Sequence, residues 1–330
     1  MSPLETAMPP YPWQHEVWQV FCRAHREQRL AHALLLSGID GVGIESLSIA
    51  MTRLILCHSP LEDLACGRCR GCELFKAESN PDYFMLEREE NSAQIKIDQV
   101  RALVDFAART PHFAGNKVVI VNEAHCLNVA AANALLKSLE EPPGACIFLL
   151  VTQRPQALLP TIRSRCQQLV VRVPVLSDSV RWLQEQGVDA AAEWLEEAGG
   201  APLRAKAWAL GDYAEQRRHV LAGLERLLSG QVGASMLAEE WVKLPIETLI
   251  QVQISVLDRA LRSQFLASGA TQKGDVLQHL IDQIKPTNAF RLRDTLTDAL
   301  EREQQQSNLV PQLVCESLAM SWESSSMTQG

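Results

Sequence analysis

A glycine-rich turn between an apolar run and a helical pattern constrains this chain more than any other feature. The run Leu34–Leu36 is followed shortly by Gly38-Ile-Asp-Gly-Val-Gly43 and then by Ile44 and Glu45. Two glycines five positions apart, followed by Lys and then Ser or Thr, form the phosphate loop that joins a strand to a helix. Alone, the turn is equally compatible with an ordinary strand-to-helix connection. Further matching segments, in order along the chain, favour the phosphate-loop interpretation.

The side chains that would handle phosphate and magnesium are replaced. Ile44 stands where a Lys would counter the β and γ phosphates, and Glu45 stands where a hydroxyl would hold magnesium. After Val118–Val121, Asn122 takes the place of an Asp ligand, and a neutral amide is a poor magnesium ligand. The degenerate residues are Gly38, Gly41, Gly43, Ile44 and Glu45 in the loop, and Asn122 and Glu123 in the acidic box. We therefore expect no ATP cofactor and no ATPase activity from the chain alone.

Four cysteines predict a metal site. Their spacing is Cys57-x8-Cys66-x2-Cys69-x2-Cys72, and nearby glycines allow tight turns. Four thiolates at such spacing suit a closed, tetrahedral, structural Zn²⁺ site. The alternative is that the four are unconnected buried thiols, although three cysteines within seven residues are rarely a packing feature. The remaining cysteines are expected to be small buried residues: Cys22, Cys126, Cys146, Cys166 and Cys315.

The composition of the chain indicates its cellular compartment and argues against DNA binding by the chain alone. No run of eighteen apolar residues and no basic start followed by an apolar stretch occurs, so we expect a cytoplasmic protein without a membrane span. In that reducing compartment, disulfides among the nine cysteines are not expected. A net charge of −8 is the wrong sign for a protein that grips duplex DNA by itself.

The hydrophobic pattern divides the chain into an α/β part and a helical part. Helices are expected over Ile97–Arg109 and Asn128–Glu141, the second ending at proline. Between such helices, five short runs predict a parallel sheet: Ala33–Ser37, Tyr83–Glu87, Lys117–Asn122, Cys146–Thr152 and Gln168–Val171. After Pro174 only helical periodicity continues. We expect three domains: residues 1–172 with the cysteine module at about 57–72, residues 173–213, and residues 214–330.

Several segments together resemble a known family. They are Tyr11-Pro-Trp13, His32–Gly38, the cysteine cluster, Asn133–Pro143 and Leu159–Cys166. In this order they resemble the clamp-loader subunits of bacterial DNA polymerase III, which belong to the AAA+ proteins. The resemblance is dense over about residues 11–172 and thin beyond. It implies an AAA+ α/β module with a zinc insertion, a small helical lid domain and an all-α collar domain used for oligomerisation.

The resemblance also implies roles for single residues. Arg165, in the segment Ser164-Arg165-Cys166, would act as an arginine finger on nucleotide bound by a neighbouring subunit. A guanidinium suits that task because it is permanently charged and can hold phosphate oxygens bidentately. Alone, Arg165 would more simply be a surface cation. Thr152 and Arg204 occupy the two sensor positions, with Arg204 alternatively a structural ion-pair partner, for example of Glu196 or Glu197.

The implied partners are the gamma or tau subunits and the delta subunit in a hetero-pentamer, with the sliding clamp and primed DNA reached through that complex. The chain would then belong to the DNA polymerase III holoenzyme, a DNA-directed DNA polymerase, without hydrolysing ATP itself. Two alternatives stay open at this point. One is an active AAA+ ATPase of the gamma or tau type, which would bind nucleotide alone. The other is a zinc-dependent nucleic-acid-binding scaffold, which would bind DNA alone in a salt-sensitive way.

Overall fold

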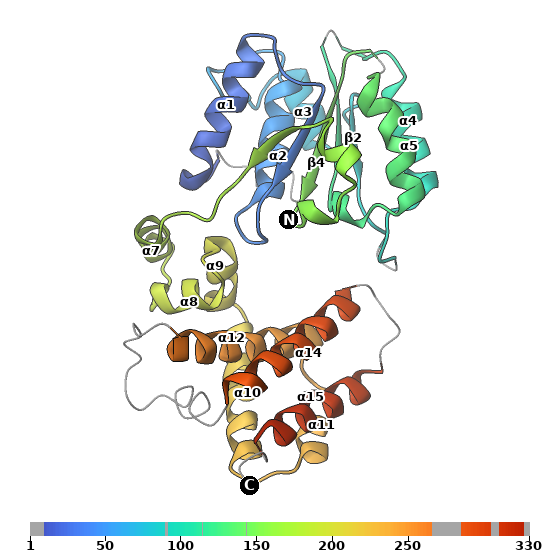
Figure 1. Ribbon diagram of the computed structural model, residues 1–330. Helices are drawn as coiled ribbons and strands as arrows, with labels where there is room; N and C mark the ends of the chain where they lie inside the picture. Colours follow the sequence, from blue (N-terminus) through green and yellow to red (C-terminus); the bar gives the residue numbers. More distant parts are fainter. Residues whose placement is uncertain are drawn as a thin grey trace. The chain divides into compact units, whose positions relative to one another are not determined.

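The structure is a computed structural model of the 330-residue chain. It describes residues 10–89, 92–113, 115–142, 144–265, 285–304 and 310–326. The chain divides into two compact units, Met1–Lys206 and Ala207–Gly330 (Figure 1). The predicted boundaries near residues 172 and 213 remain predictions. No helix of the described residues is both long and apolar enough to cross a lipid bilayer.

A five-stranded parallel sheet forms the centre of the first unit, in the order β2-β3-β4-β1-β5. The strands are β1 (Ala33–Ser37), β2 (Tyr83–Leu86), β3 (Lys117–Val121), β4 (Cys146–Thr152) and β5 (Gln167–Val170). These are the predicted strands, and each end differs from its prediction by at most one residue. The α/β fold class is therefore confirmed.

Helices connect the strands and cover both faces of the sheet (Figure 1). They are α1 (His15–Arg26), α2 (Ile44–Ile55), α3 (Arg70–Lys76), α4 (Ile97–Ala107), α5 (Val129–Glu140) and the short α6 (Pro160–Arg163). Helix α5 begins where the Oδ1 atom of Asn128 accepts a hydrogen bond of 2.8 Å from the amide of Ala131. It ends just before Pro142, which has no amide proton to continue it. The two helices predicted from periodicity are thus present.

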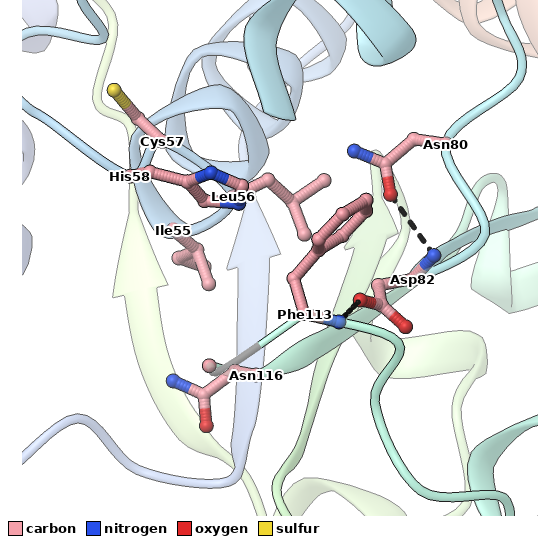
Figure 2. Close-up of a pocket in the computed structure, with 9 residues that line it drawn as sticks. Ile55, Leu56, Cys57, His58, Asn80, Asp82, Phe113 and Asn116 are labelled. Atoms are coloured by element: carbon pink, nitrogen blue, oxygen red, sulfur yellow. Dashed lines mark hydrogen bonds between the residues drawn. The ribbon is translucent and has the colours of Figure 1, made fainter. Parts of the chain in front are cut away.

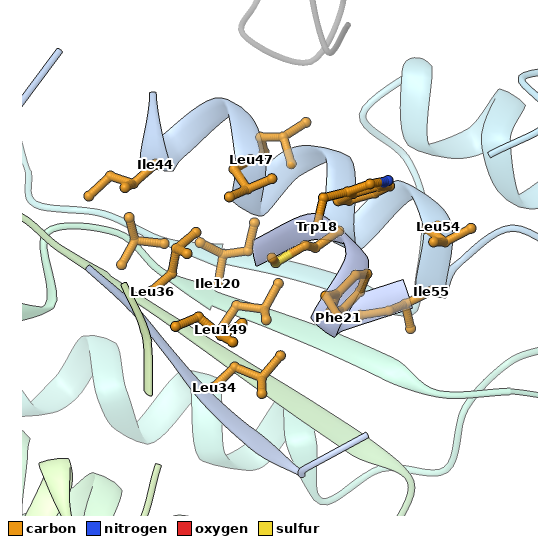
Figure 3. Packing of buried hydrophobic residues seen from close by; sticks show 14 of the residues in the cluster. Trp18, Phe21, Leu34, Leu36, Ile44, Leu47, Leu54, Ile55, Ile120 and Leu149 are labelled. Carbon is orange, nitrogen blue, oxygen red and sulfur yellow. The ribbon is translucent and has the colours of Figure 1, made fainter. Parts of the chain in front are cut away.

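The sheet separates two hydrophobic cores because successive strand residues point to opposite faces. On one face, Leu34 and Leu36 pack with residues of α1 and α2 (Figure 3). On the other face, Ala33 and Leu35 pack with residues of α4 and α5. Full burial of a leucine side chain stabilises the fold by roughly 1.5–3 kcal/mol relative to its exposed state. The alternation therefore sets the strand register, since a slip of one residue would exchange the two faces.

Three helices follow β5: α7 (Leu176–Glu185), α8 (Ala191–Glu197) and α9 (Pro202–Leu210). The second unit is helical, as predicted, and consists in its described part of α10 (Tyr213–Leu228), α11 (Ala234–Trp241), α12 (Ile246–Phe265), α14 (Pro286–Gln304) and α15 (Pro311–Ser326). Its core includes the fully buried Trp241 and Trp322. The indole of Trp322 donates a hydrogen bond of 2.7 Å to the buried amide oxygen of Gln253.

Candidate functional site

The carboxyl ends of β1, β3 and β4 bring the predicted nucleotide-handling residues to one edge of the sheet. Ser37 pairs with Thr152, and Val121 pairs with Leu150. The glycine loop follows β1, the acidic box follows β3, and Thr152 ends β4. This is the edge at which α/β proteins bind their ligands.

The glycine loop lies in close contact with α9 of the same unit. Gly41 and Gly43 both have positive φ angles, 84° and 78°, which favour glycine. A Cβ atom on Gly41 would lie 2.6 Å from the Cβ of Arg204, and one on Gly43 would lie 2.9 Å from Leu203. The amide of Leu203 donates a hydrogen bond of 3.0 Å to the carbonyl of Gly41. Glycine is thus required here for the close contact with α9.

Side chains of the protein satisfy the polar groups of the loop. The amide nitrogen of the buried Gln14 donates to the carbonyls of Val42 and Gly43, at 2.8 Å each. Arg204 donates to the Asp40 carbonyl at 2.7 Å and pairs with the Asp40 carboxylate at 3.2 Å. Arg204 therefore makes an ion pair with the loop itself, a partner that the sequence reasoning had not named.

The two replaced loop residues, Ile44 and Glu45, both make contacts within the protein. Ile44 is fully buried and packs in the core between the sheet and α2 (Figure 3). Glu45, in the first turn of α2, accepts a short hydrogen bond from the side-chain amide of Gln153. Burial, with a smaller contribution from the nearby Asp40 carboxylate, raises the pKa of Glu45 above its ordinary value. A carboxyl group thus stands where the loop of an active enzyme would meet phosphate and magnesium.

Aromatic rings pack beside the loop. Tyr11 and Trp13 stack on each other with ring centroids 5.0 Å apart. Trp182 of α7 meets both rings edge-on, at 5.8 Å and 5.1 Å. The indole of Trp13 also donates to the Val42 carbonyl at 3.0 Å. The segment Tyr11-Pro-Trp13 therefore connects the glycine loop to α7.

The side chains of the acidic box form hydrogen bonds with residues that follow β2. Glu123 is held by Arg88 through two hydrogen bonds, 2.7 Å from Nε and 3.2 Å from a terminal nitrogen. Asn122 donates to the Glu87 carboxylate at 3.2 Å. Thr152 contacts His125 at 3.1 Å, and burial together with the nearby Arg154 lowers the pKa of His125 to about 4. The lowered pKa makes His125 a weak proton acceptor, and Glu123 is paired with Arg88.

Arg165 lies away from this edge, between α6 and the beginning of β5. Its guanidinium pairs with the carboxylate of Glu140, the last residue of α5, at 2.5 Å and donates to the Thr161 carbonyl at 2.9 Å. Because β5 runs parallel to β1 and begins opposite Leu34, Arg165 sits toward the amino ends of the strands. It is therefore remote from the chain's own glycine loop, which follows the carboxyl end of β1.

The four predicted cysteines form one cluster. Their Sγ atoms all lie within 4.8 Å of one another, with 3.9 Å between Cys57 and Cys69 and 3.5 Å between Cys69 and Cys72. Tetrahedral Zn²⁺ with bonds of about 2.3 Å places its sulfur ligands about 3.8 Å apart. The donor set and its spacing therefore fit a structural zinc ion.

Backbone amides favour the thiolate form of Cys69, whereas burial raises the pKa values of Cys57 and Cys72. Although burial raises the pKa of Cys69, hydrogen bonds from the amides of Cys72 and His58 contribute to lowering it to about 6. The thiolate is the form that binds a metal. Outside the cluster, Cys22, Cys146, Cys166 and Cys315 are buried and Cys126 is half-buried. Burial raises the pKa of each of these thiols, which matches their predicted role as packing residues.

A cavity of about 470 Å³ adjoins the cysteine cluster (Figure 2). His58, next to Cys57, packs on Phe113 with ring centroids 5.2 Å apart. Asn80 donates to the Gly71 carbonyl at 3.1 Å and accepts from the amide of Asp82 at 2.9 Å. These contacts attach the cysteine module to the amino edge of the sheet.

Comparisons with known proteins give the family. Residues 13–174 match the family described as "DNA polymerase III, delta subunit". The "DNA polymerase III subunit delta'" of Pseudomonas aeruginosa is 38% identical over 323 residues, which is 95% of this chain and 97% of that protein. The chain belongs to the DNA polymerase III delta' family. Escherichia coli delta' is 36% identical over 217 residues, 65% of each chain. A solved gamma subunit-related protein from Thermotoga maritima aligns with 94% of this chain and 99% of that chain, at 20% identity and TM-score 0.48.

Membership of the delta' family confirms the resemblance to the clamp-loader subunits of DNA polymerase III. The sequence reasoning did not identify four side chains that shape the sites of this delta' protein: Gln14, Arg88, Glu140 and Gln153. Glu140 lies in a segment already singled out, but nothing in its spacing signals a pairing with Arg165. The other three are polar residues whose partners lie 28 or more positions away.

Replacement of Glu45 by Gln should change how stability depends on pH. The folded-state pKa of Glu45 is raised, so ionisation of Glu45 opposes folding and stability falls as pH rises above its ordinary value of 4.5. Glu45→Gln removes this ionisation, so its thermal unfolding midpoint should exceed that of the unmodified chain at pH 7 and approach it at pH 4. Unfolding followed by circular dichroism from pH 4 to pH 8 measures the difference. The exposed Glu16→Gln is the control, and an equal midpoint difference at every pH would contradict the prediction.

The cysteine cluster should carry one zinc ion per chain. Cys69→Ser should reduce the zinc content of the purified protein from one equivalent toward zero and lower its unfolding midpoint, because a lost metal removes folding free energy. Elemental analysis measures the metal. Cys315→Ala, in the second unit, should keep the full equivalent. Equal zinc content in both variants would show that the cluster is not the binding site.

Proposed function

We propose that this chain is the non-hydrolysing delta' subunit of a bacterial clamp loader, and that Arg165 acts in trans on ATP bound by a neighbouring subunit. In that role it supports ATP-dependent loading of the sliding clamp onto primed DNA. The observation that carries the proposal is the contrast between the two ends of the module. At one end the glycine loop is closed by internal contacts, and at the other a guanidinium is held near the surface.

The closed loop supports the absence of self-catalysis. Ile44, at the position of the phosphate-loop Lys, is a core residue, and Glu45, at the position of the magnesium-binding hydroxyl, is a half-buried carboxyl group. To bind ATP, the loop would have to exchange its contacts with Gln14 and Arg204 for contacts with phosphate. It would also bring phosphate against Glu45 without the usual cations, which is electrostatically unfavourable.

The surroundings of Arg165 suit a residue that changes partners. The Arg165 side chain is 33% exposed and the Glu140 side chain is 47% exposed. An ion pair with this much solvent access contributes only about 0–1 kcal/mol. A phosphate oxyanion in a desolvated interface offers a stronger, bidentate interaction. Glu140 would thus hold the guanidinium in place and release it at low cost when a neighbour presents nucleotide.

The partners follow from the family. We assign to this chain gamma or tau subunits and a delta subunit in a cytoplasmic hetero-pentamer, with contact to the sliding clamp and primed DNA through that assembly. The helical second unit supplies the oligomerisation surface and α7 to α9 form the lid. Zn²⁺ serves the cysteine module as a structural ion. Thr152 and Arg204 keep the sensor positions without sensing nucleotide, since both are engaged within the chain.

Replacement of Arg165 by Ala should slow clamp loading in a reconstituted complex by about tenfold or more, because a trans arginine stabilises the charge that develops in phosphoryl transfer. Assembly should be unchanged, as the lost contacts to Glu140 and Thr161 lie within one chain. Size-exclusion chromatography tests assembly, and ATP hydrolysis with primed DNA and clamp tests function.

The exposed Arg172→Ala provides the control because it removes an arginine at the opposite end of β5 from Arg165 and leaves the Arg165–Glu140 pair intact. Arg165→Lys separates charge from geometry, since Lys keeps the charge and loses the planar fork. Loading at the unmodified rate by the Arg165→Ala complex would refute the proposed role.

A further inference from the structure

A second cavity, of about 480 Å³, lies between the end of α4 and the beginning of β3. The glycine loop follows the carboxyl end of β1, whereas Lys117 begins β3 in the same parallel sheet. The cavity therefore lies at the opposite edge of the sheet from the glycine loop. None of its residues takes part in the proposed function described above.

Lys117 is a buried cation that lines this cavity. The residue is only 2% exposed. Its ammonium group donates to the Phe106 carbonyl at 2.9 Å and lies 3.9 Å from the centre of the Phe106 ring. An ammonium has three donors, so the carbonyl and the ring leave one without a described partner. Within the described part of the chain, no carboxylate forms an ion pair with Lys117.

The other polar residues of the cavity wall are also donors. Arg109 and His112 are exposed and carry nitrogen donors, and Thr110 adds a hydroxyl group. The described lining contains no acidic residue. A buried positive charge without a counter-ion is costly, so an anion entering this cavity would gain a strong interaction with Lys117.

The loop that carries these donors is held in a fixed conformation. Both carboxylate oxygens of the buried Asp82 accept hydrogen bonds from it, 2.7 Å from the amide of His112 and 3.0 Å from the amide of Phe113. Asp82 faces the neighbouring cavity beside the cysteine cluster rather than this one (Figure 2). The negative charge of Asp82 is thus used within the loop, and the backbone at His112 is held in place before any ligand binds.

We propose that this cavity binds a phosphate group through Lys117, Arg109 and His112. Donors from three side chains and the hydroxyl of Thr110 match the several oxygens of a phosphate, and the guanidinium can hold two of them. The Phe106 ring is covered by Lys117, so the cavity recognises the phosphate and not an attached base. The phosphate has two sources, free inorganic phosphate or the backbone of single-stranded DNA. Because the chain has a net charge of −8, its overall field does not attract an anion from a distance. Binding of phosphate therefore depends on the donors within the cavity.

The test uses thermal unfolding of the full chain in increasing inorganic phosphate, with chloride at equal ionic strength as reference. Phosphate bound to the folded chain should raise the unfolding midpoint above the chloride value. Arg109→Gln and His112→Gln, both at exposed positions, should each raise the phosphate concentration for half of the effect by about tenfold. Lys117→Met should abolish the rise of the unfolding midpoint in phosphate above its value in chloride. Arg101→Gln, on an exposed part of α4 outside the cavity, should behave like the unmodified chain.

A short single-stranded oligonucleotide, titrated under the same conditions, identifies the source. Binding that depends on Arg109 and is displaced by phosphate assigns the cavity to the DNA backbone. An effect of phosphate without oligonucleotide binding assigns it to free phosphate. An equal response to phosphate in the unmodified, Arg109→Gln and His112→Gln chains would overturn the proposal. Binding of a glutamate-rich peptide without any phosphate effect would overturn it as well.

Discussion

The glycine loop packs closely against α9, and this contact occupies the edge of the sheet where a nucleotide would bind. In an active nucleotide hydrolase, the loop and lid enclose phosphate. Here Gly41 faces Arg204 and Gly43 faces Leu203 so closely that no larger residue fits. The carboxyl group of Glu45 occupies the first turn of α2, where a phosphate loop would place a bound phosphate. Contacts within the chain thus hold the glycine loop against α9.

The contacts of the glycine loop within the chain stabilise the α/β module that carries Arg165. Arg165 follows a short helix, and the adjacent Cys166 is buried in the core formed with α4 and α5. The backbone at Arg165 is therefore anchored, while its side chain is partly exposed. Precision in placing a guanidinium near a partner's phosphate depends on such an anchored backbone. The proposed loss of the chain's own nucleotide chemistry and the proposed trans role of Arg165 are compatible because they involve opposite ends of the strands.

Much of the fold followed from the sequence because it depends on local patterns. The five strands and the cysteine cluster are visible in short stretches, through alternating apolar residues and through ligand spacing. The pairing of polar side chains was not predictable in this way. Gln153 reaches Glu45 across 108 positions, and Arg88 reaches Glu123 across 35. Hydrophobic periodicity specifies which face a residue occupies, but not which polar group from another element it meets.

The amino edge of the sheet shows how one buried carboxylate can organise two neighbouring regions. Asp82 fixes the loop after α4, and that loop contributes Phe113 to the cavity beside the cysteine module and His112 to the basic cavity. Asn80, two positions earlier, holds the module through the Gly71 carbonyl. Gly71 itself is required, since a side chain there would meet the Leu56 carbonyl. A metal that stiffens the cysteine module would therefore also stiffen Asn80 and Asp82, and through them the loop that carries the basic residues.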